Sequence, residues 1–168
     1  MHVASYLPLC YNLIRINWER EKMLSAIYPV PESKVGLPFY LLGIGRTSPE
    51  FHVKRDKGLT SHQFLYTVKG CGVLEVGNRK YKLEKNSFMY LPPELPHEYY
   101  PENDEWNTCW MIFRGDFLKG IMNTMGFIGE MVATDADLTA FKKIFDRIYS
   151  LAADNLHNGE KCSLLIYN

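Results

Sequence analysis

Long hydrophobic runs are absent from this sequence of 168 residues. The longest uncharged apolar stretches, such as CWMIF at residues 109–113, are only a handful of residues, whereas a helix that crosses a bilayer needs about 20. The N-terminus also lacks a basic region followed by an apolar segment and a small-residue cleavage site, so no secretory leader is predicted. We therefore expect a soluble protein that has no membrane partner.

Net charge is also missing, because 19 basic and 19 acidic side chains cancel. Without a basic surplus, nothing in the overall charge would draw the chain onto nucleic acid or an anionic membrane. The four cysteines, Cys10, Cys71, Cys109 and Cys162, lie far apart and form no CxxC pair. This spacing favours reduced thiols and a cytoplasmic location.

What the sequence does have is three zones of different periodicity, in a length that suits one hydrophobic core. Residues 1–37 are expected to form an N-terminal arm, in which residues 10–26 have the apolar spacing of a short amphipathic helix. Residues 38–115 contain short strand-like runs separated by turn signals, as in an antiparallel barrel or sandwich. In residues 116–168, the apolar residues recur with the period of an α-helix.

Two hairpins are predicted inside the second zone. The first turns at KGCG, where Gly70 and Gly72 are expected to supply positive φ angles, and the second turns at Gly77 and Asn78.

One long helix is predicted in the third zone, within residues 134–155, with Thr134 or Asp135 as its cap. After it, the apolar run CSLLIYN stops without a capping signal, so we expect the sequence to end inside a helix of a longer protein. The helical stripe consists of Leu138, Phe141, Ile144, Phe145, Ile148 and Leu151.

His97 lies in the proline-rich turn YLPPELPHEYYP and raises the question of a metal site, because the strand pattern resembles the cupin superfamily. Metal-binding cupins carry two histidines and a glutamate in their first motif, and here Gln63 stands in the glutamate position while His62 is one residue out of register. One residue of slip turns a strand side chain to the opposite face. A transition metal needs three or four converging ligands, so no metal or other cofactor is predicted. His97 is expected to serve as a neutral donor or acceptor, or as a strut for the turn.

A narrower resemblance covers residues 51–114 and depends on four pieces in a fixed order. They are RDKG, the two hairpins from YTVKGCG to YLPP, the loop PHEYYP, and the strand WNTCWMIFRG. Together they resemble the N-terminal effector-binding domain of AraC-type transcription regulators. The resemblance implies a mainly β fold with C-terminal α, namely a cupin-like antiparallel β-barrel of the jelly-roll type followed by helices.

The resemblance also implies a binding site. In the arabinose-responsive member of the family, the sugar contacts an arginine, a tyrosine and a tryptophan, which correspond here to Arg55, Tyr99 and Trp110. Thr108 stands where that protein has a sugar-contacting histidine, and His97 adjoins the same site. A small effector, a carbohydrate in the first instance, is therefore expected in the barrel.

The residues leave alternatives open. Arg55 also fits a surface arginine paired with Asp56 or a glutamate, and Trp110 also fits ordinary core packing. Strand alternation does not say which face Tyr66 and Tyr90 occupy, and Tyr99 is expected in solvent or at a pocket rim because it follows a turn.

The partners follow from the same resemblance. It implies a homodimer and a DNA-binding helix-turn-helix domain beyond Asn168. The helix around residues 141–151 and the run from Cys162 are the expected dimer surface. An alternative class is a small cupin enzyme, a metal-dependent isomerase, lyase or dioxygenase, for which Glu94, His97 and Glu98 form the available cluster. A third is a sugar-binding module without a regulatory role.

Overall fold

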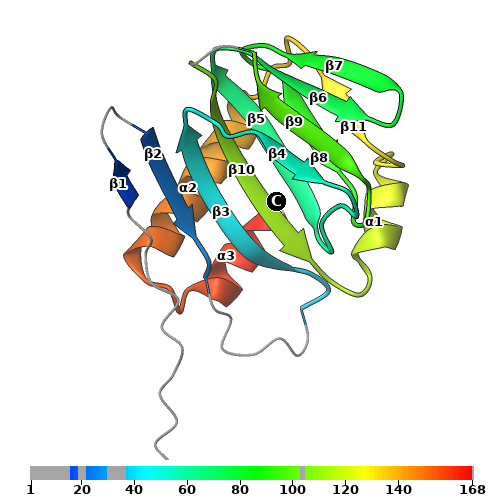
Figure 1. The fold of residues 1–168 in the computed structure, drawn as a ribbon. Helices are drawn as coiled ribbons and strands as arrows, with labels where there is room; N and C mark the ends of the chain where they lie inside the picture. The colour runs from blue at the N-terminus through cyan, green and yellow to red at the C-terminus, as the bar shows by residue number, and fades with distance from the viewer. Residues whose placement is uncertain (1–15, 19–21, 30–36, 103–104, 168) are drawn as a thin grey trace, which may run out of the picture.

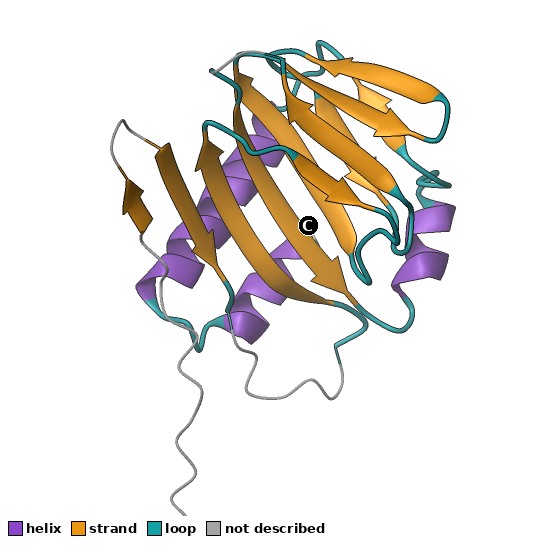
Figure 2. Cartoon of the chain, in the orientation of Figure 1, coloured by secondary structure: helices purple, strands orange, loops and turns teal. Residues whose placement is uncertain are grey.

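The structure, a computed structural model, describes residues 16–18, 22–29, 37–102 and 105–167. Its strands pair into two antiparallel sheets that face each other, and its two C-terminal helices lie behind the larger sheet (Figure 1). Figure 2 shows the same three layers by type of secondary structure. The fold is mainly β with C-terminal helices and is cupin-like, which confirms the predicted class.

The larger sheet has the strand order β1-β2-β3-β10-β5-β8-β11. Its strands are β1 (Ile16–Trp18), β2 (Lys22–Ile27), β3 (Tyr40–Ser48), β10 (Asn107–Arg114), β5 (His62–Lys69), β8 (Phe88–Leu91) and β11 (Met131–Ala133). The smaller sheet consists of β4 (Val53–Arg55), β9 (His97–Pro101), β6 (Gly72–Val76) and β7 (Arg79–Leu83), in that spatial order. The helices are α1 (Leu118–Thr124), α2 (Thr139–Asp154) and α3 (Gly159–Ile166).

The larger sheet separates two hydrophobic cores, because successive side chains in a strand point to opposite faces. In β10, Cys109, Met111 and Phe113 belong to the core beneath the helices. Trp110 packs instead against the core between the two sheets. The sheet therefore presents one face to the helices and the other to the space between the two sheets.

Trp106 fills one end of the space between the sheets. Its side chain is fully buried, and its indole Nε1 donates a hydrogen bond to Thr67 Oγ1 at 3.0 Å. Gly72 permits this packing, because a Cβ at that position would lie 2.4 Å from the indole ring. Gly70 has a positive φ of 76°, as predicted, whereas Gly72 lies within β6 and serves this close approach instead of a turn. The predicted hairpin turn at Gly77 is confirmed.

The predicted long helix is present as α2, and its apolar stripe buries Phe145, Ile148 and Ala152. Its start lies later than expected. The backbone N–H of Thr139 donates to Asp137 Oδ1 at 3.0 Å, so Asp137 satisfies a free donor of the first turn and the expected caps are wrong. Residues 131–133 form β11 against β8, which leaves residues 134 and 135 in the connection.

The amphipathic helix expected within residues 10–26 is wrong where the structure describes it. Strands β1 and β2 pair with each other, and β2 continues the larger sheet beside β3 with Leu24 opposite Thr47 and Ala26 opposite Gly45. Pairing with an open sheet edge satisfies the backbone groups of β2, and such tertiary contacts override local periodicity. Residues 10–15 and 19–21 lie outside the described part of the chain. None of the helices in the described ranges is long and apolar enough for a membrane span.

Candidate functional site

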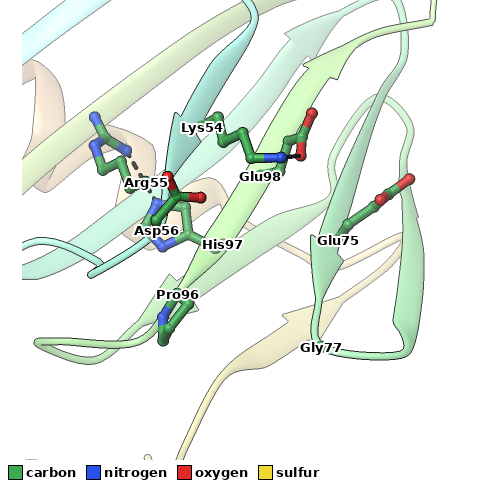
Figure 3. A pocket seen from close by; sticks show the side chains of 8 residues that line it. All are labelled: Lys54, Arg55, Asp56, Glu75, Gly77, Pro96, His97 and Glu98. Carbon is green, nitrogen blue, oxygen red and sulfur yellow. Dashed lines mark hydrogen bonds and ion pairs between the residues drawn. The ribbon is translucent and has the colours of Figure 1, made fainter.

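Strands β4 and β9 form one edge of the smaller sheet and hold most of the candidate residues. Arg55 lies opposite His97 and Lys54 lies opposite Glu98 in the strand pairing. Alternation directs Arg55 and His97 to one face, while Lys54 and Glu98 form an ion pair at 3.1 Å on the other. Figure 3 shows both pairs, with the guanidinium of Arg55 directed away from Glu75 and Glu98.

The guanidinium of Arg55 is half-buried, and its hydrogen-bond partners in the described part of the chain are neutral side chains. Its Nη1 lies 3.0 Å from Nε2 of His97 and 3.4 Å from Oε1 of Gln63, and its Cζ lies 5.6 Å from the centre of the Tyr99 ring. The ion pairs found among the described residues do not include Arg55, so the expected alternative of a pair with Asp56 does not occur there.

His97 is buried and is held at both ring nitrogens. Its Nδ1 lies 2.7 Å from the backbone carbonyl oxygen of Leu95, and its Nε2 faces Arg55. Burial lowers the pKa of His97 below its usual value, and the positive charge of Arg55 lowers it further, against the hydrogen bond to Leu95. The imidazole is therefore neutral near pH 7 and accepts a hydrogen bond from the guanidinium.

Glu50 is a member of this group that the sequence did not indicate, because it lies one residue before the stretch that resembles the family. Its side chain is buried, receives a very short hydrogen bond from Thr108 Oγ1, and receives another from the backbone N–H of Phe51 at 3.0 Å. Burial raises the pKa of Glu50, while these hydrogen bonds and the charge of Arg55 act in the opposite direction. Thr108 is thus connected to the site by its hydrogen bond to the buried carboxyl group of Glu50.

Trp110 lies flat against β3. A Cβ at Gly45 would come within 2.4 Å of its Cζ2 atom, and its Nε1 donates to Thr47 Oγ1 at 3.0 Å. Thr47 is also the strand partner of Thr108. The ring of Tyr28 lies 6.4 Å from the ring of Trp110. The indole is therefore fixed in orientation by a glycine below it and a threonine at its edge.

The structure brings the predicted residues to the space between the sheets, although not all into one hollow. A pocket of about 170 Å³ is lined by Arg55 and His97, together with Lys54, Asp56, Glu75, Gly77, Pro96 and Glu98 (Figure 3). Trp110, Thr108 and Tyr99 do not line it. Tyr99 is buried in the core beside Trp106, which corrects its expected place at a rim. It is buried because β9 begins at His97, so Tyr99 is a strand residue on the inner face.

Tyr66 and Tyr90 lie on the other face of the larger sheet, in the core beneath the helices. The hydroxyl of Tyr90 lies 2.7 Å from Nδ1 of His62, whose ring also stacks on Phe113. His62 therefore points away from the space between the sheets, as its register predicted. No group of three or more His, Cys, Asp or Glu side chains in the described ranges is arranged to hold a metal ion.

Comparison with known proteins identifies a family. Residues 38–168 match the family described as AraC-like ligand binding domain. An uncharacterized protein from Methanocaldococcus jannaschii is 33% identical over 42 residues, which is 25% of this chain and 34% of that protein, so the match spans about a third of the relative's length.

Many solved structures match part of this chain, among them the following two. ToxT from Vibrio cholerae has a TM-score of 0.49 at 12% identity, over 66% of this chain and 47% of that one. A cupin 2 conserved barrel domain protein from Salinispora arenicola has a TM-score of 0.43 at 17% identity, over 74% and 99% respectively. Because the family match spans more than half of the sequence, this chain belongs to the AraC-like ligand binding domain family.

Proposed function

We propose that this chain is the ligand-sensing and dimerisation domain of a bacterial AraC-type transcription regulator. The effector is a small molecule, a sugar, bound between the two sheets by Arg55, Tyr99, Trp110, His97 and Thr108. DNA is read by a helix-turn-helix domain outside this chain. The proposal includes the division into an arm (1–37), an effector-binding barrel (38–115) and a helical segment for dimerisation (116–168).

The observation that carries the proposal is the environment of Arg55. A half-buried cation is costly unless hydrogen bonds or an opposite charge compensate it. The direct contacts of Arg55 in the described ranges are with the neutral groups of His97, Gln63 and Tyr99, and the buried carboxyl group of Glu50 acts on it only through its charge, without an ion pair. A guanidinium offers five N–H donors in a planar fork, which matches vicinal hydroxyls or a carboxylate. A ligand oxygen near Arg55 would therefore complete the site.

Trp110 is a second residue that supports a sugar as the ligand. Its N–H is already engaged by Thr47, so the ring face is the part available for binding. An indole face is a suitable platform for the C–H side of a pyranose ring. Gly45 allows the indole to lie close to β3, because a Cβ at that position would come within 2.4 Å of the ring.

Strand β3 is the proposed route from this site to the helices. On the side of the site it carries Thr47, and on the opposite side it carries Arg46. Arg46 Nη2 pairs with Asp146 Oδ1 of α2 at 2.8 Å, and its Cζ lies 4.3 Å from the centre of the Tyr149 ring. A ligand that moves β3 therefore moves α2, and this shifts the equilibrium between dimer arrangements.

The groove between α2 and α3 is the proposed dimer surface. It has a volume of about 540 Å³, and Leu164 at its edge is 56% exposed. The apolar stripe that was expected to serve the dimer is largely used elsewhere, because Phe145, Ile148 and Cys162 are buried beneath the larger sheet. The remaining groove is lined by Arg147, Ser150, Leu151, Lys161, Leu164 and Leu165.

A ligand screen with two matched variants tests the effector site. Monosaccharides, oligosaccharides and sugar acids are added to the chain, and the melting temperature is measured. A compound that raises it should lose its effect in Arg55→Met, with a loss of affinity of about tenfold or more, because a charge-assisted hydrogen bond contributes about 1.5–3 kcal/mol.

Lys82→Met is the control for this experiment. Lys82 lies on β7, pairs with Glu84 at 2.8 Å and does not line the pocket beside Arg55, so this variant should respond as the unchanged chain does. Equal responses from Arg55→Met and the unchanged chain would reject the site.

A further inference from the structure

A second hollow, of about 220 Å³, lies on the other side of the larger sheet. It is bounded by β5, β10 and all three helices, and its lining includes Phe64 and Phe113 from the sheet, Met122 from α1, Phe141 from α2 and Ile166 from α3. All of its lining residues are Phe, Leu, Ile or Met. It is therefore a cavity between two layers of the fold, with apolar side chains on every wall.

This hollow is separate from the effector site. Phe113 faces the helices. On the same strand, Trp110 packs against the core between the two sheets, and Thr108 donates a hydrogen bond to Glu50. The two spaces are thus divided by the thickness of the sheet. The hollow also differs in chemistry, because its lining has no charged or hydrogen-bonding side chain, whereas Arg55, Gln63 and His97 line or adjoin the other space.

The chemistry of the lining selects the ligand. A sugar or a carboxylate would lose its hydrogen bonds to water and find no partner, which opposes binding strongly. An apolar cavity of about 150 Å³ stays dry and admits benzene, so this larger one has room for one ring or two fused rings. Several phenylalanine rings lie within aromatic contact of one another, with centroids of Phe64 and Phe113 at 4.7 Å and of Phe64 and Phe127 at 5.9 Å. Such rings offer faces and edges to an aromatic guest.

The hollow also has an opening toward solvent at the end of α1. Met125 belongs to its lining and is 65% exposed, and Ile128, three residues further along the chain, is 77% exposed. The following segment places Phe127 in the lining between Gly126 and Gly129, both of which have positive φ angles. A protein interior is normally packed with few voids larger than a water molecule. A hollow of this size, with apolar walls and an exposed apolar rim, has the features of a ligand site.

We propose that the hollow between the larger sheet and the helices binds an uncharged apolar small molecule of one or two rings. The bound molecule contacts α1, α2 and α3 together, so it holds the helical layer against the sheet. It acts at a site of its own and does not require the effector site to exist. An apolar compound is therefore a second input to the same helices.

The test uses toluene and naphthalene as probes and benzoate as the charged counterpart of toluene. The whole chain is labelled at its methionine methyl groups and titrated while the melting temperature and the methyl NMR signals are followed. We expect toluene to raise the melting temperature and to shift the signals of Met122 and Met125. Met89 packs in the core between the sheets and should not shift. Benzoate should have no effect.

Two variants test whether toluene binds in this hollow. Ile121→Phe adds a ring to the lining of the hollow and should abolish the response to toluene. Gly120→Ala, the preceding residue, meets no atom within 4 Å and should keep it. Arg55→Met should also keep the toluene response, so failure of the effector site and failure of this site give different results.

Each of four results would overturn the proposal. In the first, benzoate would shift the methionine signals as much as toluene does. In the second, Ile121→Phe would respond to toluene as the unchanged chain does. In the third, neither probe would shift the signals of Met122 and Met125. If those two signals instead change with protein concentration alone, a second copy of the chain covers the hollow and the proposal is also wrong. The probe comparison decides the matter even where a variant fails to fold.

Discussion

Arg55 and His97 lie opposite each other on β4 and β9, with Nη1 and Nε2 3.0 Å apart, and this contact determines which nitrogen of the histidine carries the proton. A guanidinium donates hydrogen bonds and never accepts them, so Nε2 of His97 must be the acceptor. The proton therefore lies on Nδ1, which donates to the carbonyl oxygen of Leu95 at 2.7 Å. His97 is thus an orienting group for the arginine, because its acceptor is held in place by the turn that precedes β9.

Replacement of His97 tests this orienting role. Gln at this position offers an oxygen near the place of Nε2, whereas Leu offers no acceptor. We expect His97→Leu to weaken binding of an effector by about tenfold, since one hydrogen bond to a charged group is lost, and His97→Gln to retain most of the affinity. Isothermal titration with a compound from the ligand screen measures both. Equal affinities for the Leu variant and the unchanged chain would contradict the orienting role.

Gly45→Ala tests the position of Trp110. The added Cβ would meet Cζ2 of Trp110 at 2.4 Å and the carbonyl oxygen of Ser25 at 2.9 Å, so the indole has to move. We expect a loss of about 1–3 kcal/mol in the free energy of unfolding, as for other overpacked sites, and a weaker response to a sugar. Urea denaturation and ligand titration measure the two effects.

Gly120→Ala is the control for Gly45→Ala. Gly120 lies in α1 with open space around its Cβ position. Alanine is favoured over glycine in a helix by roughly 0.5–1 kcal/mol, so this variant should be more stable than the unchanged chain. If both glycine variants changed stability in the same direction, steric contact with Trp110 would not be the cause.

The lowered pKa of His62 predicts that the folded chain loses stability in mild acid. Burial lowers the pKa of His62 to about 4, and the ordinary value in an unfolded chain is about 6.5. Between these values the unfolded chain binds a proton that the folded chain does not, so stability is complete above pH 6.5 and falls as the pH drops toward 4. The expected loss from this group is about 2 kcal/mol between pH 8 and pH 5. His97, whose pKa is also lowered, adds a loss in the same direction.

The variant His62→Asn isolates that contribution. Asn keeps a polar atom near Tyr90 but does not titrate, so its free energy of unfolding should depend less steeply on pH between 8 and 5. Urea unfolding curves at several pH values provide the comparison. Parallel pH profiles for the variant and the unchanged chain would show that another group is responsible.

Leu164→Glu tests the proposed dimer surface. A charged side chain at the edge of the groove between α2 and α3 would have to be desolvated in a dimer, so we expect a shift from dimer to monomer. Light scattering after size-exclusion chromatography measures the mass. Ile128→Glu, at an exposed residue far from this groove in sequence, should leave the dimer intact. A monomeric unchanged chain, or a dimer that survives Leu164→Glu, would refute the surface.

Some parts of the site were predictable from the sequence because they are local. The turn at Gly77, the placement of Arg55 and His97 near strand ends, and the helical stripe of α2 depend on residues that are close along the chain. Glu50 was not predictable in this way. Its carboxyl group becomes part of the site only because Thr108, 58 residues later, donates a hydrogen bond to it.

The same limit explains the segment before β3. Apolar spacing in residues 10–26 is compatible with a helix, yet β2 pairs with β3 in the structure. A strand gains its hydrogen bonds from partner strands that local periodicity cannot reveal.

The sequence by itself determined which segments alternate and which repeat with a helical period, because those patterns are properties of neighbouring residues. Only the tertiary structure decided which layer covers each face of the larger sheet. Alternation states that Tyr66 and Phe64 share a face, but not that α2 covers that face while the smaller sheet covers the face of Leu65. That choice depends on contacts between elements far apart in the chain, whose free energies no local pattern encodes.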